Sequence, residues 1–237
     1  MRRALVPLLA AWAALSLLAA PAEAFTDEVI MIPLETAATG PVMVPVWVVY
    51  PDDYDPAKPV TTLLAFPPGD QTLEMVDVNF NWFVPQALDR GWLTIGPAAP
   101  TGFGFARQGR PLLGPLIDEL LKRFPVADGK FHLAGQSNGG NTAFAAALDF
   151  PDGFRSITVI PGSPPDAAEN ANVDRLKGIG VHMFVGEQDL PYLERMNVTR
   201  EALRAAGIPS DLTIIPGSGH VINFLRGANA RMMFDAM

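Results

Sequence analysis

The sequence predicts an α/β protein whose mostly parallel sheet is covered by helices on both faces. Short, continuous apolar runs alternate with helical patterns along the chain, an order of elements that is typical of parallel sheets. The apolar runs do not alternate with polar residues, as expected for strands that are buried on both faces. Between one such run and an alanine-rich segment stands a serine bounded by glycines, which predicts a sharp strand-to-helix turn.

The first two strands are expected to form an antiparallel hairpin. Residues 42–50 are β-branched and aromatic and end before Pro51, which predicts a strand, and residues 28–34 are expected to pair with it. The later apolar runs predict further strands over residues 61–66, 92–95, 131–134, 157–160, 181–185 and 212–215. The helical patterns cover residues 72–90, 113–124, 141–149, 173–177, 192–206 and 223–234.

Residues 1–24 have the pattern of a secretory signal peptide. Arg2 and Arg3 supply a positive end, residues 5–20 an apolar stretch, and residues 22–24 an Ala-Glu-Ala cleavage site. A retained membrane anchor is the alternative, but the apolar stretch is short for a membrane span and is interrupted. We therefore expect an exported protein, periplasmic or secreted, with one domain over residues 25–237.

Composition limits the partners of this domain. Without residues 1–24 the chain has 15 Lys and Arg against 24 Asp and Glu, a net charge of −9. Such a surface repels phosphate backbones and anionic lipid, so we expect no nucleic-acid partner and no stable membrane association. We also expect a monomer. The chain has no cysteine, which excludes disulfides and thiolate chemistry. Neither a metal-binding motif nor a phosphate or dinucleotide loop is present, so no metal and no cofactor are expected.

Residues 135–139 read Gly-Gln-Ser-Asn-Gly and carry the chemistry of the chain. A predicted strand precedes them and a predicted helix follows, and in such an elbow a Cβ two residues to either side of the serine would collide with backbone. The turn would expose the Ser137 hydroxyl at the carboxyl end of the sheet, where ligands of such sheets collect. This context favours a nucleophile over an ordinary glycine-rich turn.

A serine nucleophile needs a base, and the chain has three histidines. His132 and His182 lie inside predicted strands, where a structural histidine is expected. His220 follows the last predicted strand in a glycine-containing loop that can carry an imidazole over the sheet edge, so we predict His220 as the base. Its alternative is a solvent-exposed loop histidine.

The base in turn needs a carboxylate to hold its tautomer. Asp189 follows the predicted strand 181–185 and is our candidate. A helix cap or turn former before Pro191 is its alternative, and Glu187 is the backup acid.

The negative charge that develops on an attacked carbonyl needs fixed donors, which are usually backbone N–H groups. Asn138, directly after the serine, supplies one. The second is expected from residues 67–71. Two of these are prolines, which lack an N–H, so we choose Asp70, with Gly69 and Gln71 as near alternatives; an ordinary proline-glycine turn is the other interpretation.

Aromatic residues are candidates for a substrate pocket. Trp82 follows the predicted oxyanion residues, and Phe103 and Phe105 follow the strand 92–95. Packing in the core is the alternative for these side chains. Because only residues 161–180 fill the connection where a lid could stand, we expect an open site without a sizeable lid.

From about Val42 onward the chain resembles the α/β-hydrolase family, with Ser137, Asp189 and His220 in the family's chain order. Residues 46–55 and 135–140 are most similar to secreted esterases of the polyhydroxybutyrate depolymerase and feruloyl esterase type, and secondarily to dienelactone hydrolases. The sequence departs from many relatives at residues 67–69, which read Pro-Pro-Gly where relatives carry His-Gly.

The resemblance implies a serine hydrolase that cleaves a small-molecule or polymeric carboxylic ester through an acyl-enzyme. A serine peptidase of the prolyl oligopeptidase type would use the same three residues. A catalytically inactive binding protein with this fold is a further alternative, because the proline pair is unusual at an oxyanion loop. Fold alone does not decide among them.

Overall fold

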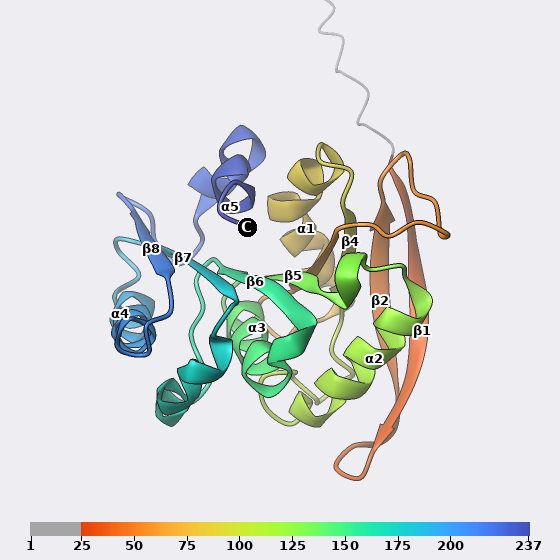
Figure 1. The fold of residues 1–237 in the computed structure, drawn as a ribbon, viewed down its shortest axis with the longest axis horizontal. Coiled ribbons are helices and arrows are strands. Elements are labelled where there is room, and N and C mark those ends of the chain that lie inside the picture. Colours follow the sequence, from red (N-terminus) through yellow and green to blue (C-terminus); the bar gives the residue numbers. More distant parts are fainter. Residues whose placement is uncertain (1–24) are drawn as a thin grey trace, which may run out of the picture.

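An eight-stranded sheet runs through residues 25–237, the part of the chain that the computed structural model describes (Figure 1). Its strand order is β1-β2-β4-β3-β5-β6-β7-β8. The predicted signal peptide, residues 1–24, lies outside the described residues. The sheet agrees with the predicted fold class.

The amino-terminal hairpin is confirmed. β1 (Thr26–Thr36) pairs antiparallel with β2 (Gly40–Tyr50), and β2 pairs antiparallel with β4 (Leu93–Pro97). This hairpin forms one edge of the sheet, and all later pairings are parallel.

The parallel strands occupy the predicted apolar runs. Every residue of β3, β4 and β5 is buried, which explains why their sequences are apolar throughout. β6 begins at Phe154, three residues before the predicted start. The exposed Arg155, its second residue, interrupts the apolar pattern on which the prediction relied. The parallel strands besides β4 are β3 (Thr62–Phe66), β5 (Phe131–Gly135), β6 (Phe154–Val159), β7 (Gly180–Gly186) and β8 (Ser210–Ile215).

Helices cover both faces of the sheet. Figure 1 shows α1 and α5 on one face and α2, α3 and α4 on the other. α2 buries residues at helical spacing, Leu113, Leu116, Ile117 and Leu120, so its apolar stripe faces the core. The helices are α1 (Leu73–Leu88), α2 (Leu113–Arg123), α3 (Asn138–Asp149), α4 (Leu190–Ala205) and α5 (Arg231–Phe234). No helix among residues 25–237 is long and apolar enough to cross a bilayer.

Two segments predicted as α-helices consist largely of 3₁₀ turns. Residues 223–234 form two 3₁₀ turns, Asn223–Leu225 and Gly227–Ala230, before the single turn of α5. Gly227 has a φ of 56°, a left-handed conformation that interrupts a right-handed helix. The predicted helix 173–177 is the end of a 3₁₀ segment, Ala167–Leu176.

Candidate active site

Ser137 stands in the turn between β5 and α3. Its φ is 55° and its ψ is −115°, a strained conformation that costs a non-glycine residue about 1–3 kcal/mol. Backbone hydrogen bonds hold the turn: the N–H of Ser137 donates to the carbonyl of Pro161 at 2.8 Å, and the N–H of Asn141 donates to the carbonyl of Ser137 at 3.0 Å. The predicted strand-to-helix elbow is therefore present.

The glycines of the elbow allow close backbone packing. A Cβ on Gly135 would overlap the carbonyl oxygen of Gly139, and a Cβ on Gly139 would overlap that of Phe66 at the end of β3. α3 can therefore begin directly against the ends of two strands. This contact places the first turn of α3 beside residues 67–71, which we call the oxyanion loop.

The ends of β7 and β8 approach each other equally closely. A Cβ on Gly186 would overlap the carbonyl oxygens of Ser218 and Gly219, and the N–H of Gln188 donates to the carbonyl of Ser218 at 2.9 Å. The carboxylate of Glu187 accepts the N–H of Gly217 at 2.9 Å. Glu187, the backup acid, is thus bonded to the backbone of the loop that precedes His220.

The structure brings together the three residues predicted for catalysis. The Asp189 carboxylate lies 2.7 Å from Nδ1 of His220, and Nε2 of His220 lies 2.9 Å from Oγ of Ser137. Because the carboxylate can only accept, Nδ1 carries the proton of a neutral ring and Nε2 accepts from the serine hydroxyl. A hydroxyl, an imidazole and a carboxylate in this order can form a nucleophile with its base.

Burial differs along this chain of hydrogen bonds. The Asp189 side chain is 8% exposed, whereas the His220 side chain is 44% exposed. Asp189 occupies the N-cap position of α4 but caps no backbone N–H with its side chain. Its carboxylate therefore faces His220 and not the helix. This excludes the alternative in which the Asp189 side chain serves as a helix cap.

The other two histidines lie in strands, as predicted. Nδ1 of His132 is 2.8 Å from Oγ of Ser156, and its ring stacks on Trp92 with centroids 4.7 Å apart. Burial lowers the pKa of His132 to about 4. Burial also lowers the pKa of His182, which lies 3.5 Å from the Asp211 carboxylate. Both histidines therefore favour the neutral form.

The oxyanion candidates are Asn138 and the oxyanion loop. Among the described residues, the backbone N–H groups of Asn138, Gly69 and Asp70 have no hydrogen-bond partner. The N–H of Gln71 donates to the carbonyl of Pro68 at 3.0 Å, so this near alternative is already engaged. Asp70 and Gly69 both stay available for the second donor position.

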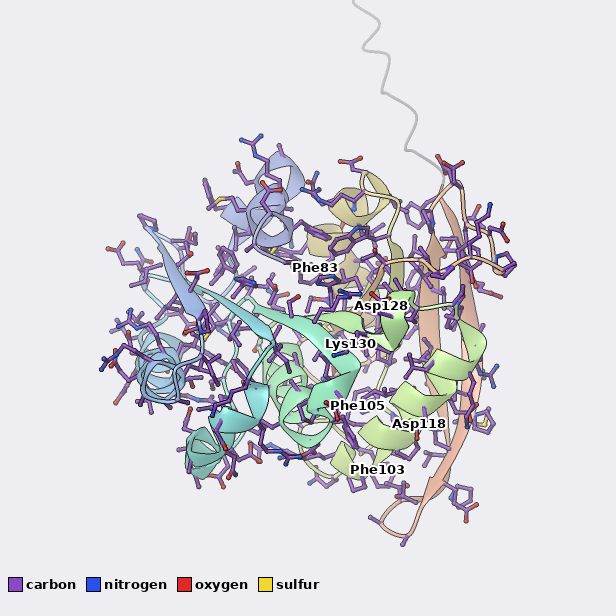
Figure 2. The ribbon with its side chains drawn as sticks, viewed as in Figure 1. Phe83, Phe103, Phe105, Asp118, Asp128 and Lys130 are labelled. Atoms are coloured by element: carbon purple, nitrogen blue, oxygen red, sulfur yellow. The ribbon has the colours of Figure 1, made fainter. Side chains whose placement is uncertain are left out.

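The pocket prediction requires a correction. Trp82 is 1% exposed and Phe105 is fully buried, so both pack in the core and line no open pocket. Trp82 donates its indole N–H to the carbonyl of Ile222 at 3.3 Å, and Phe105 packs edge-on against Phe66 with centroids 5.7 Å apart. Phe103, on the same loop as Phe105 (Figure 2), is half-buried.

Two side chains beside the site were not predicted: that of Tyr192, and that of Gln71, which was singled out only for its backbone N–H. The ring centroid of Tyr192 lies 5.2 Å from that of His220, and the Tyr192 hydroxyl accepts the Asn141 amide at 3.3 Å. Gln71 is 1% exposed, and its side chain bonds to Pro67 in its own loop and to two other segments, at Thr142 and Phe105. Tyr192 lies three residues after Asp189, and this short spacing could have indicated its place near the site. No local pattern indicates the contacts of the Gln71 side chain.

Exposed apolar residues follow two of the site residues in the chain. Leu190, Val221 and Phe224 are 67%, 50% and 50% exposed, and the first two directly follow Asp189 and His220 in the chain. No sizeable lid stands among the described residues, where residues 161–180 contain only the 3₁₀ segment noted above. A cavity of about 840 Å³ lies at the opposite, amino-terminal edge of the parallel strands, lined by Val60 and Gly91 among others.

Known structures share this fold, although no family model matches the sequence and no curated protein matches it. A thermostable esterase has a TM-score of 0.66 at 20% identity, over 80% of this chain and 55% of the esterase. A ferulic acid esterase has a TM-score of 0.68 at 15% identity, over 90% and 98% of the two chains. Dipeptidyl peptidase 4 of Porphyromonas gingivalis has a TM-score of 0.59 at 17% identity, over 89% of this chain and 36% of the peptidase. The chain thus has the α/β-hydrolase fold.

Proposed function

We propose that this protein is an exported serine hydrolase that cleaves carboxylic esters. The observation that carries the proposal is the hydrogen-bonded chain from Asp189 through His220 to Ser137, at the carboxyl ends of the strands. Esterases among the similar structures support a hydrolytic activity. Export is proposed from the signal-peptide pattern of residues 1–24, which leads to the periplasm or the medium.

In this mechanism Oγ of Ser137 attacks the ester carbonyl while Nε2 of His220 takes the hydroxyl proton. Asp189 stabilises the imidazolium that results. The carbonyl oxygen becomes an oxyanion, which accepts hydrogen bonds from the N–H of Asn138 and of Asp70 or Gly69. His220 then protonates the departing alcohol, and an acyl group stays on Ser137.

Deacylation repeats these roles with water. His220 takes a proton from the water molecule as its oxygen attacks the acyl carbon, and it returns the proton to Oγ of Ser137 as the acid leaves. Leu190 and Val221, exposed apolar residues that directly follow Asp189 and His220, are the candidates for contact with the acyl or alcohol part of the ester. Burial of such groups favours substrates with an apolar part close to the carbonyl.

A Ser137→Ala exchange tests the proposal. Purified protein should hydrolyse short-chain p-nitrophenyl esters, and the variant should lose at least about a thousandfold in kcat, because the nucleophile is gone. Ser210→Ala, at the start of β8, is the matched control and should keep its activity. Full activity of a folded Ser137→Ala variant would refute the assignment.

A serine peptidase is the second candidate, and the similarity to the peptidase from Porphyromonas gingivalis favours it. The same three residues would then attack an amide. The chain spans 36% of that peptidase, so the similarity covers only part of it. Faster turnover of a peptide panel than of the ester panel would place this candidate first.

A further inference from the structure

We infer that Asn138 acts twice: besides its backbone N–H, its side-chain amide positions the oxyanion loop. This inference rests on the proposed function. The amide nitrogen Nδ2 of Asn138 donates to the carbonyl oxygen of Gly69 at 2.7 Å. The bond joins the residue after the nucleophile to the loop that would supply the second oxyanion donor.

The geometry of a peptide bond explains what this contact fixes. In a trans peptide the carbonyl and the following N–H are coplanar and point in opposite directions. Holding the Gly69 carbonyl therefore fixes the direction of the Asp70 N–H. Gly69 has a φ of 61°, and a glycine explores many conformations at little cost. Without the tether, the turn that the Gln71 N–H closes onto the Pro68 carbonyl still admits either orientation of its central peptide, between Gly69 and Asp70.

A second tether holds the loop from inside the molecule. The Gln71 amide nitrogen donates to Oγ1 of Thr142 at 3.0 Å, and Oγ1 of Thr142 donates to the carbonyl of Asn138 at 3.0 Å. The Gln71 amide oxygen accepts the N–H of Phe105 at 2.9 Å. Both ends of the donor-bearing segment are thus attached to the first turn of α3, which begins at Asn138.

This arrangement links the N–H of Asn138 and that of Asp70, the second donor that the sequence favours, to one helical turn. The N–H of Asn138 belongs to that turn, and the N–H of Asp70 is oriented by the side chain of the same residue. Fixed donors stabilise the transition state because they need no reorientation when charge develops. Loss of the tether should therefore reduce kcat and leave KM nearly unchanged, since the ground-state ester carries no full charge on its oxygen.

The test uses Asn138→Asp and Asn138→Ala. The aspartate has nearly the same shape but places an anionic oxygen opposite the Gly69 carbonyl, whereas the alanine removes the contact. Both should lower kcat roughly tenfold to hundredfold, below the loss found when an oxyanion donor is deleted, with KM within about twofold. Affinity for a trifluoromethyl ketone, which forms a charged adduct with a nucleophilic serine, should fall in parallel with kcat.

Asn197→Asp is the matched control, because Nδ2 of Asn197 also donates to a backbone carbonyl, that of Leu193, at 2.8 Å in α4. It should keep wild-type kcat. Wild-type kcat in both folded Asn138 variants would overturn the inference, as would a loss confined to KM. An inactive wild type that resists labelling by a fluorophosphonate would instead refute the proposed function, and the inference with it. Melting temperatures show which variants are folded. If Asn138→Asp does not fold, the kcat of Asn138→Ala alone tests the inference.

Discussion

At the level of single residues, the acid of the proposed mechanism depends on which of two neighbouring carboxylates faces His220. Both Glu187 and Asp189 follow β7, and either could have faced the histidine. The structure separates them by their partners: Asp189 bonds to the His220 ring, whereas Glu187 accepts a backbone N–H. Partners such as Thr142 for Gln71 lie 71 residues away, so no local pattern could predict that contact.

The choice of acid makes a residue-scale prediction. Asp189→Asn would offer Nδ1 of His220 an amide whose oxygen or nitrogen can face it, and this favours the wrong tautomer for accepting the Ser137 proton. We expect kcat for the ester to fall about 10⁴-fold, as for other triads. Glu187→Gln keeps an acceptor for Gly217 and should stay within a fewfold of wild type. A larger loss in Glu187→Gln than in Asp189→Asn would reverse the assignment.

At the scale of elements, the strand predictions succeeded where burial alone determines the sequence pattern. β3 and β5 are buried on both faces, so their apolar runs reflect burial directly. The prediction of one helix over residues 223–234 failed because their buried residues, Leu225, Ala230, Met233 and Phe234, pack from three separate short turns. Their spacing imitates a helical face. Only the tertiary packing of those turns reveals the break at Gly227.

The elbow gives an element-scale prediction. Gly139→Ala places a Cβ onto the carbonyl oxygen of Phe66, and backbone cannot yield as a side-chain tip can. We expect a loss of about 1–3 kcal/mol in the free energy of unfolding, together with lower activity because α3 must shift. In Gly153→Ala the new Cβ meets only a methyl group of Ile117 at 3.9 Å. Urea unfolding of both variants checks this; equal stabilities would contradict the close packing.

At the scale of the whole molecule, the alternation of elements predicted the fold class, and the fold placed the site. Parallel strands bring residues 137, 189 and 220 to one sheet edge although they are far apart in the sequence. The sequence could not predict the pocket. Aromatic side chains such as those of Trp82 and Phe105 are found both in hydrophobic cores and in substrate pockets, so the residue type does not distinguish the two. Only their burial in the structure assigns them to the core.

The stability of the whole molecule should depend on pH through His132. Its pKa is lowered to about 4 by burial, below the ordinary value near 6.5. Between these values the unfolded chain binds a proton that the folded protein does not, so stability falls as pH decreases from about 6.5 to 4. His132→Gln should remove a slope of up to about 1.4 kcal/mol per pH unit. Parallel pH profiles of unfolding free energy for wild type and variant would contradict this.

Covalent labelling tests the proposed nucleophile most simply, because it reports an activated serine without requiring the natural substrate. Purified protein is incubated with a fluorophosphonate, and the modified residue is located by peptide mass spectrometry. We predict an adduct on Ser137 that is lost in His220→Ala, since the imidazole activates the hydroxyl. A folded protein that forms no adduct would contradict a serine hydrolase and favour a binding protein with this fold. An adduct at another serine would contradict the assignment of Ser137 as the nucleophile.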